Sequence, residues 1–136
     1  MAEGPRLLAG GNPQIPKGDG QAPVDAYIAA MPGWKQEIGR GVEALVTELV
    51  PEATRAVRWN SPFWGVEGQG FFLSIHCLTK VVRCTFFAGR SLDPVPAGGT
   101  PKAEPARWAD VGEGEFDEGA FRVWIAQAAR VPGWTP

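Results

Sequence analysis

Two runs near the middle of the chain, residues 71–78 and 81–87, have the alternation expected of the arms of a β-hairpin. Because side chains alternate across a strand, each run divides into two sets that face opposite sides of the sheet. The first set is apolar and contains Phe71, Leu73, Ile75, Cys77, Val82, Cys84 and Phe86. The second set is mixed and contains Phe72, Ser74, His76, Leu78, Val81, Arg83, Thr85 and Phe87. We therefore predict a sheet with one buried face and one face on which polar groups lie within an apolar frame.

The rest of the chain predicts an α+β fold. Apolar residues recur at helical spacing in three segments, residues 23–31, 34–49 and 117–130. A period of two indicates further strands over 56–59 and 62–66, with a turn at 60–62 and a fifth, edge strand over 106–111. We expect an antiparallel sheet of four or five strands with the helices packed on one face. Residues 89–105, which hold four prolines, are expected to form a long loop.

The length of 136 residues predicts one domain. Residues 1–21 contain many glycines and prolines and are expected to form an irregular N-terminal arm. Residues 22–136 are expected to form the single α+β domain.

Composition narrows the class of partner. The net charge is −2 and the pI is about 5.4, so we expect no nucleic-acid partner. The chain has no apolar run long enough to span a bilayer and no leader-like start, which predicts a cytoplasmic protein without membrane contacts. The segment 53–90 is basic, with five basic residues against one acid, a charge of +4 that leaves −6 elsewhere. Both cysteines lie on the apolar strand face, where reduced, buried thiols are expected.

The mixed strand face is the candidate binding surface. A two-residue turn at Thr79–Lys80 would place His76 opposite Arg83 and Ser74 opposite Thr85. The turn lacks the usual Gly or Asn, so a register shifted by two residues, which keeps the same faces, stays open. An arginine offers two parallel hydrogen bonds to a carboxylate or phosphate, and surrounding apolar groups would strengthen them. An ordinary solvent-exposed sheet face would show the same mixture, so both interpretations stay open. The candidate ligand-binding residues are Arg58, Trp59, Asn60, Ser74, His76 and Arg83.

Catalytic and metal chemistry have less support in the sequence. His76 and Cys77 are adjacent and so point to opposite faces, which excludes a Cys–His dyad. Ser74 and His76 share a face and could serve a small hydrolase or transferase, although no carboxylate is placed to orient the ring. No zinc-type spacing is present, and we expect neither a metal site nor a cofactor. Carboxylates that could hold iron occur at Glu113, Glu115, Asp117 and Glu118. The start of the last helix, whose dipole these acids complement, explains them without a metal and is the favoured interpretation.

Several segments, in order along nearly the whole chain, resemble the YdhG-like domain of unknown function. They are GNPQIPKGDG at 11–20, MPGW at 31–34, WNSPF at 59–63, FFLS at 71–74, TFF at 85–87 and GGTPK at 98–102. The resemblance implies a small bacterial α+β domain with helices on one face of an antiparallel sheet. One branch of the family resembles frataxin-type iron chaperones. The family has no agreed catalytic residues, so the resemblance marks only the Trp59–Pro62 turn and the hairpin as important.

Three functions follow as hypotheses. The first is non-catalytic binding of a small ligand, with anions among the candidates, or of a protein partner on the mixed sheet face. The second is iron handling in the frataxin manner, which would need surface carboxylates. The third is a small hydrolase or transferase that uses Ser74 and His76.

Overall fold

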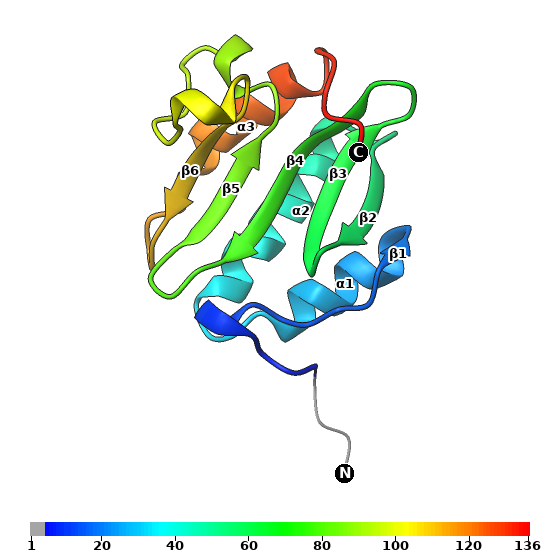
Figure 1. The fold of residues 1–136 in the computed structure, drawn as a ribbon, viewed down its shortest axis with the longest axis vertical. Coiled ribbons are helices and arrows are strands. Elements are labelled where there is room, and N and C mark those ends of the chain that lie inside the picture. Colours follow the sequence, from blue (N-terminus) through cyan, green and yellow to red (C-terminus); the bar gives the residue numbers. More distant parts are fainter. Residues whose placement is uncertain (1–4) are drawn as a thin grey trace.

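The computed structural model describes residues 5–136 as one antiparallel sheet with three helices on one of its faces (Figure 1). The strands are β1 (Gly18–Asp19), β2 (Thr54–Arg58), β3 (Ser61–Val66), β4 (Gly70–Cys77), β5 (Val82–Phe86) and β6 (Arg107–Val111). The helices are α1 (Gln21–Ala30), α2 (Lys35–Leu49) and α3 (Glu118–Ala128). Short 3₁₀ turns occur at Ala9–Gly11, Gly89–Ser91 and Pro101–Ala103. The strands follow one another as a meander in the order β1-β2-β3-β4-β5-β6.

The α+β class, the antiparallel sheet and the helices on one face are confirmed, but the strand count of four or five is wrong. The additional strand is β1, which lies within the segment that we expected to be an irregular arm. It is two residues long and pairs Gly18 with Val57 and Asp19 with Ala56. Two residues are too few to show a period-two pattern in the sequence. The segment is extended because it pairs with the edge of β2. The first four residues of the expected arm lie outside the described residues.

The core lies between the helices and one face of the sheet. Apolar side chains from α1 and α2 meet those from the strands, among them Tyr27, Val42, Trp64, Ile75 and Phe86. Both thiols are free and buried there, as the apolar strand face predicted. Burial raises the pKa of Cys77 and that of Cys84, so both are held in the neutral thiol form. Within residues 5–136, none of the helices combines the length and apolar character needed to cross a membrane.

The β4–β5 hairpin has the predicted register, with His76 opposite Arg83 and Ser74 opposite Thr85. The predicted faces are wrong at the start of β4. Trp64 pairs with Leu73 whereas Gly65 pairs with Phe71, so a β-bulge inserts Phe72 as an extra residue. As a result Phe72 joins the buried core, while the Phe71 ring lies 5.1 Å from that of Phe63.

The face of the sheet that the helices do not cover is called the open face below. Three segments border it in Figure 1: the N-terminal arm at one end, and the 88–105 loop and the C-terminal tail at the other. The tail, residues 131–136, was not predicted to take part in the sheet. Trp134 of the tail pairs with Phe71 of β4, and each residue donates its N–H to the carbonyl oxygen of the other at 2.8 Å. This pairing lies beyond the last residue of β5.

Candidate functional site

The six candidate residues do not form one pocket, and five of them already have partners within the protein. The two arginines are held by carboxylates. Arg83 donates two hydrogen bonds to Asp110 of β6, at 2.8 and 3.0 Å, and its guanidinium lies 4.6 Å from the centre of the Trp108 ring. Arg58 donates to Asp19 of β1 at 2.5 Å. Both arginines are therefore already paired with a carboxylate, so neither offers an unpaired charge to an anionic ligand.

Two of the polar candidates support the backbone. The Ser74 hydroxyl is buried and donates to the carbonyl oxygen of Pro62 at 2.7 Å, away from His76. The Asn60 side chain accepts from the N–H of Ile15 at 3.1 Å, and the Asn60 carbonyl accepts from the Asn12 side chain at 2.8 Å. Asn60 thus fastens the β2–β3 turn to the N-terminal arm.

Asn12 is the buried centre of that attachment. Its side-chain oxygen accepts a short hydrogen bond from the Tyr27 hydroxyl and a second, at 3.1 Å, from the N–H of Cys77. Lys35 of α2 adds a further clamp, because its ammonium donates to the carbonyls of Gly10 at 2.7 Å and Leu78 at 2.5 Å. The arm is consequently tied to α1, α2, β4 and the Trp59–Asn60 turn.

His76 lies beside Ser61 rather than Ser74. Its Nδ1 is 2.7 Å from the Ser61 hydroxyl oxygen, across the β3–β4 pairing. Partial burial lowers the pKa of His76 below its usual value, so the neutral ring is favoured near pH 7. A serine close to a neutral imidazole is one element of nucleophilic catalysis, but Ser61 is only 7% exposed. The contact fixes the ring orientation of the half-buried imidazole.

We expect the single histidine to titrate below about 6.5, the value of an unperturbed imidazole. The unfolded chain would then bind the extra proton more readily, so stability is lost as pH falls through 6.5 towards the folded-state pKa. An NMR titration of the imidazole protons measures the midpoint directly, since the chain has one histidine. A midpoint at or above 6.5 would contradict the burial of His76.

Trp59 is the candidate that remains available to a ligand. It lies in the two-residue turn between β2 and β3 and is 66% exposed. Both turn residues have positive φ, +50° at Trp59 and +58° at Asn60. The turn thus falls one residue earlier than predicted, because Ser61 and Pro62 belong to β3. A positive φ is uncommon for a bulky residue and is a form of strain that is often found at binding sites.

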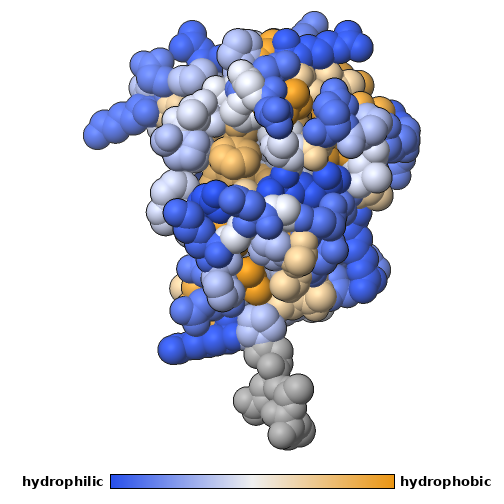
Figure 2. Space-filling model, turned by 90° about the vertical axis from the view of Figure 1, so that its right-hand side faces the viewer, coloured by the Kyte–Doolittle hydropathy of each residue, from blue (hydrophilic) through white to orange (hydrophobic). Residues whose placement is uncertain are grey.

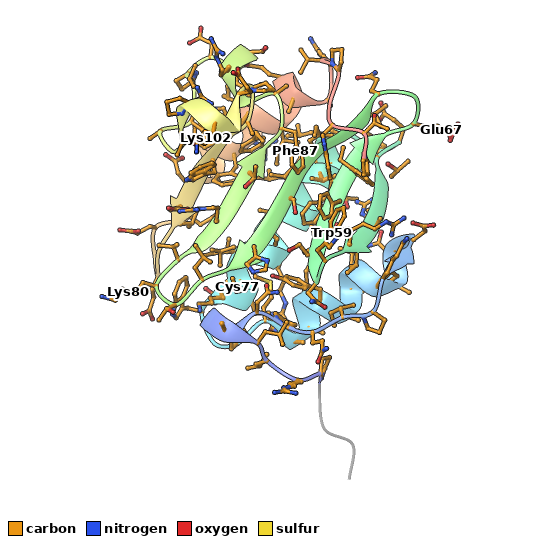
Figure 3. All side chains as sticks on the ribbon, viewed as in Figure 1. Trp59, Glu67, Cys77, Lys80, Phe87 and Lys102 are labelled. Carbon is orange, nitrogen blue, oxygen red and sulfur yellow. The ribbon has the colours of Figure 1, made fainter. Side chains whose placement is uncertain are left out.

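Trp59 belongs to a group of five rings in mutual contact, which we call the aromatic surface. Figure 3 shows two of its members, Trp59 and Phe87, on the open face. Phe63 is at its centre, with the rings of Trp59, Phe71, Phe87 and Trp134 within 5.1 to 6.0 Å of it. Trp134 also contacts Trp59 at 5.8 Å and Phe87 at 5.3 Å. Phe63 is 5% exposed, whereas Trp59 and Trp134 are 66% and 38% exposed. The group therefore has a buried centre and two exposed indoles at the surface.

Sequence reasoning missed this arrangement. Trp134 belongs to no periodic segment, and the bulge that turns Phe71 to the open face has no clear sequence signal. Trp108 and Asp110 could have been found, because the predicted edge strand carries them at the alternating spacing that faces Thr85 and Arg83.

Three cavities adjoin the aromatic surface. One of about 400 Å³ lies beside Trp59 and is lined by the arm residues 14–17 and Asn60. A second, of about 310 Å³, lies between Trp134 and the 88–105 loop with the adjoining Ala106. The third, about 500 Å³, lies at the β1–β2 edge, with Phe71 and Ala56 in its lining. Figure 2 looks at this edge and shows apolar surface in a hollow framed by hydrophilic groups.

Three of the four acids considered for iron have structural roles. Asp117 caps α3 by accepting from the N–H of Ala120 at 3.0 Å, and Glu115 accepts from the N–H of Gly112 at 3.0 Å. Glu118 pairs with Arg122 at 3.2 Å. Among residues 5–136, no three His, Cys, Asp or Glu side chains gather as a metal site.

Comparison with protein-family models, with curated proteins and with solved structures found no match to this chain. The resemblance to the YdhG-like domain therefore stays a prediction, and the function rests on the geometry of the open face.

Proposed function

We propose that this protein is a non-catalytic binding module that takes an apolar ring, from a small ligand or from a protein partner's side chain, on the open face of its sheet. One observation carries the proposal: a strained turn holds Trp59 two-thirds exposed against the buried ring of Phe63 and beside the partly exposed Trp134. Exposed, fixed indoles provide large contact area at little cost in conformational entropy.

The polar groups of the open face offer a ligand directional hydrogen bonds rather than an unpaired charge. The imidazole of His76 is held by Ser61, and its other ring nitrogen makes no side-chain hydrogen bond within residues 5–136. Arg58 and Arg83 are engaged by Asp19 and Asp110. The proposed ligand is thus recognised mainly by stacking of its ring on the aromatic surface. His76 serves as a neutral hydrogen-bonding group. An acidic substituent on the ligand is tolerated but not required.

Replacing Trp59 by glycine is expected to abolish this binding without unfolding the protein. Glycine adopts positive φ without strain, so the variant removes the ring while keeping the turn. A thermal-shift titration with phenylacetate and phenyl phosphate should raise the Tm of the wild-type protein with at least one probe, by mass action. The rise should disappear in Trp59→Gly.

The control for this test is Val123→Ala, which removes an exposed apolar side chain from α3 on the opposite side of the sheet. It should keep the full rise in Tm. No rise with either probe, or an equal rise in Trp59→Gly, would overturn the proposal. Saturable ferrous-iron binding that is lost in Glu115→Gln and Asp117→Asn would favour the iron-handling alternative instead.

A further inference from the structure

The cavity between the loop and the tail has a lining without charge. It is bounded by the rings of Phe87 and Trp134, by Pro105 and Pro132, and by Ala88 and Ala106. Its volume of about 310 Å³ is at the small end of the range for ligand pockets, about 300–1,000 Å³. A molecule with one aromatic ring suits this size.

Hydrogen bonds hold both walls of the cavity in place. On the loop side, the N–H of Arg90 donates to the carbonyl of Pro105 at 2.9 Å. On the tail side, the N–H of Gly133 donates to the backbone carbonyl of Gln69 at 2.7 Å, and Trp134 is paired with Phe71. Gly133 is packed so closely on Phe71 that a β-carbon there would lie 2.1 Å from the Phe71 carbonyl oxygen. The tail therefore has one close-fitting position, and the cavity exists before any ligand enters.

We propose that this cavity binds a small, uncharged, single-ring aromatic molecule. An ionised group would lose its hydration on entering and would find no partner of opposite charge in the lining. The guanidinium of Arg107, the residue that follows Ala106, donates to the carbonyls of Glu104 at 2.7 Å and Ala106 at 2.6 Å. A neutral ring would instead contact Phe87 and Trp134 and displace water from apolar surface.

This inference deepens the proposed function, since Phe87 and Trp134 belong to the aromatic surface, and it makes a distinct claim about ligand charge. The probe is p-cresol, with phenylacetate and phenyl phosphate as charged probes of similar ring size. We expect p-cresol to shift amide resonances of the cavity residues in ¹H–¹⁵N spectra of the full chain, at lower concentration than either charged probe.

A cavity-filling variant tests the location. Ala106→Phe should weaken p-cresol binding at least tenfold, because the new ring occupies the space. The matched control is Ala26→Phe, an exposed position on α1, which should leave binding unchanged. Ala103→Phe blocks the cavity from the 3₁₀ turn and gives the same test if Ala106→Phe does not fold.

The outcomes separate the two proposals. Failure of p-cresol to bind, or equal binding to both cavity-filling variants, would overturn the uncharged-ligand site. If phenylacetate still bound in a Trp59-dependent way, the proposed function would survive that failure. Loss of p-cresol binding in the cavity-filling variants alone supports the assignment.

Discussion

Replacing Asn12 by alanine is expected to lower the free energy of unfolding by about 3 kcal/mol, since each buried polar group left without a partner costs roughly 1–3 kcal/mol. The substitution removes the acceptor of the Tyr27 hydroxyl and of the Cys77 N–H, and the donor to the Asn60 carbonyl. Asn12 is 1% exposed, so water does not readily replace it. Urea unfolding of the full chain measures the change.

The control for Asn12→Ala is Gln14→Ala, an exposed position two residues along the same arm. We expect it to change stability by less than about 0.5 kcal/mol, as is usual for surface substitutions. A similarly small loss in Asn12→Ala would mean that the arm is not fastened to the sheet as described. The Asn60 turn would then lack its support, and the fixed position of Trp59 would be in doubt.

Replacing Phe63 by alanine is expected to cost about 3 kcal/mol of stability, within the range of buried Phe-to-Ala substitutions. Phe63 is the ring against which the four other rings of the aromatic surface pack. Its removal should therefore also eliminate the Tm rise produced by phenylacetate or phenyl phosphate. Thermal unfolding with and without these probes measures both effects.

Phe121→Ala is the matched control, because Phe121 is a 2% exposed ring of the core on the helix side of the sheet. Both variants should lose similar stability, but only Phe63→Ala should lose the response to the probes. Phe63→Leu, which keeps most of the volume, separates a binding defect from unfolding. An equal loss of response in Phe121→Ala would show that the aromatic surface has no special role.

Much of the fold could be predicted because it depends on local periodicity. Helix α2 places its buried residues Ile38, Val42 and Leu45 at helical spacing. Alternation fixed the faces of the β4–β5 hairpin, and of the registers left open the structure has the one with a two-residue turn. Contacts of this kind are encoded by neighbouring residues, so a single sequence reveals them.

The unpredicted features arise from interactions between distant segments. Strand β1 forms only because β2 offers an edge, and the bulge at Phe72 has no local signature. Trp134 reaches the aromatic surface through the pairing of a six-residue tail with β4. Arg58 and Arg83 looked free in the sequence, although the sheet brings a carboxylate to each. Among the six candidates, Trp59 therefore stays largely exposed while both arginines have carboxylate partners, and the binding role of each residue stays a prediction.

The most direct test of the open face as the binding surface is ¹⁹F NMR of the full chain labelled with 5-fluorotryptophan, titrated with phenylacetate and p-cresol. The six resonances report on every indole in the protein and can be assigned by single Trp-to-Phe substitutions. The proposed surface predicts saturable shifts at Trp59 and Trp134 while the fully buried Trp64 stays unchanged. Shifts confined to Trp34 or Trp124 on the helix side, or no saturable shift at Trp59 and Trp134, would contradict it.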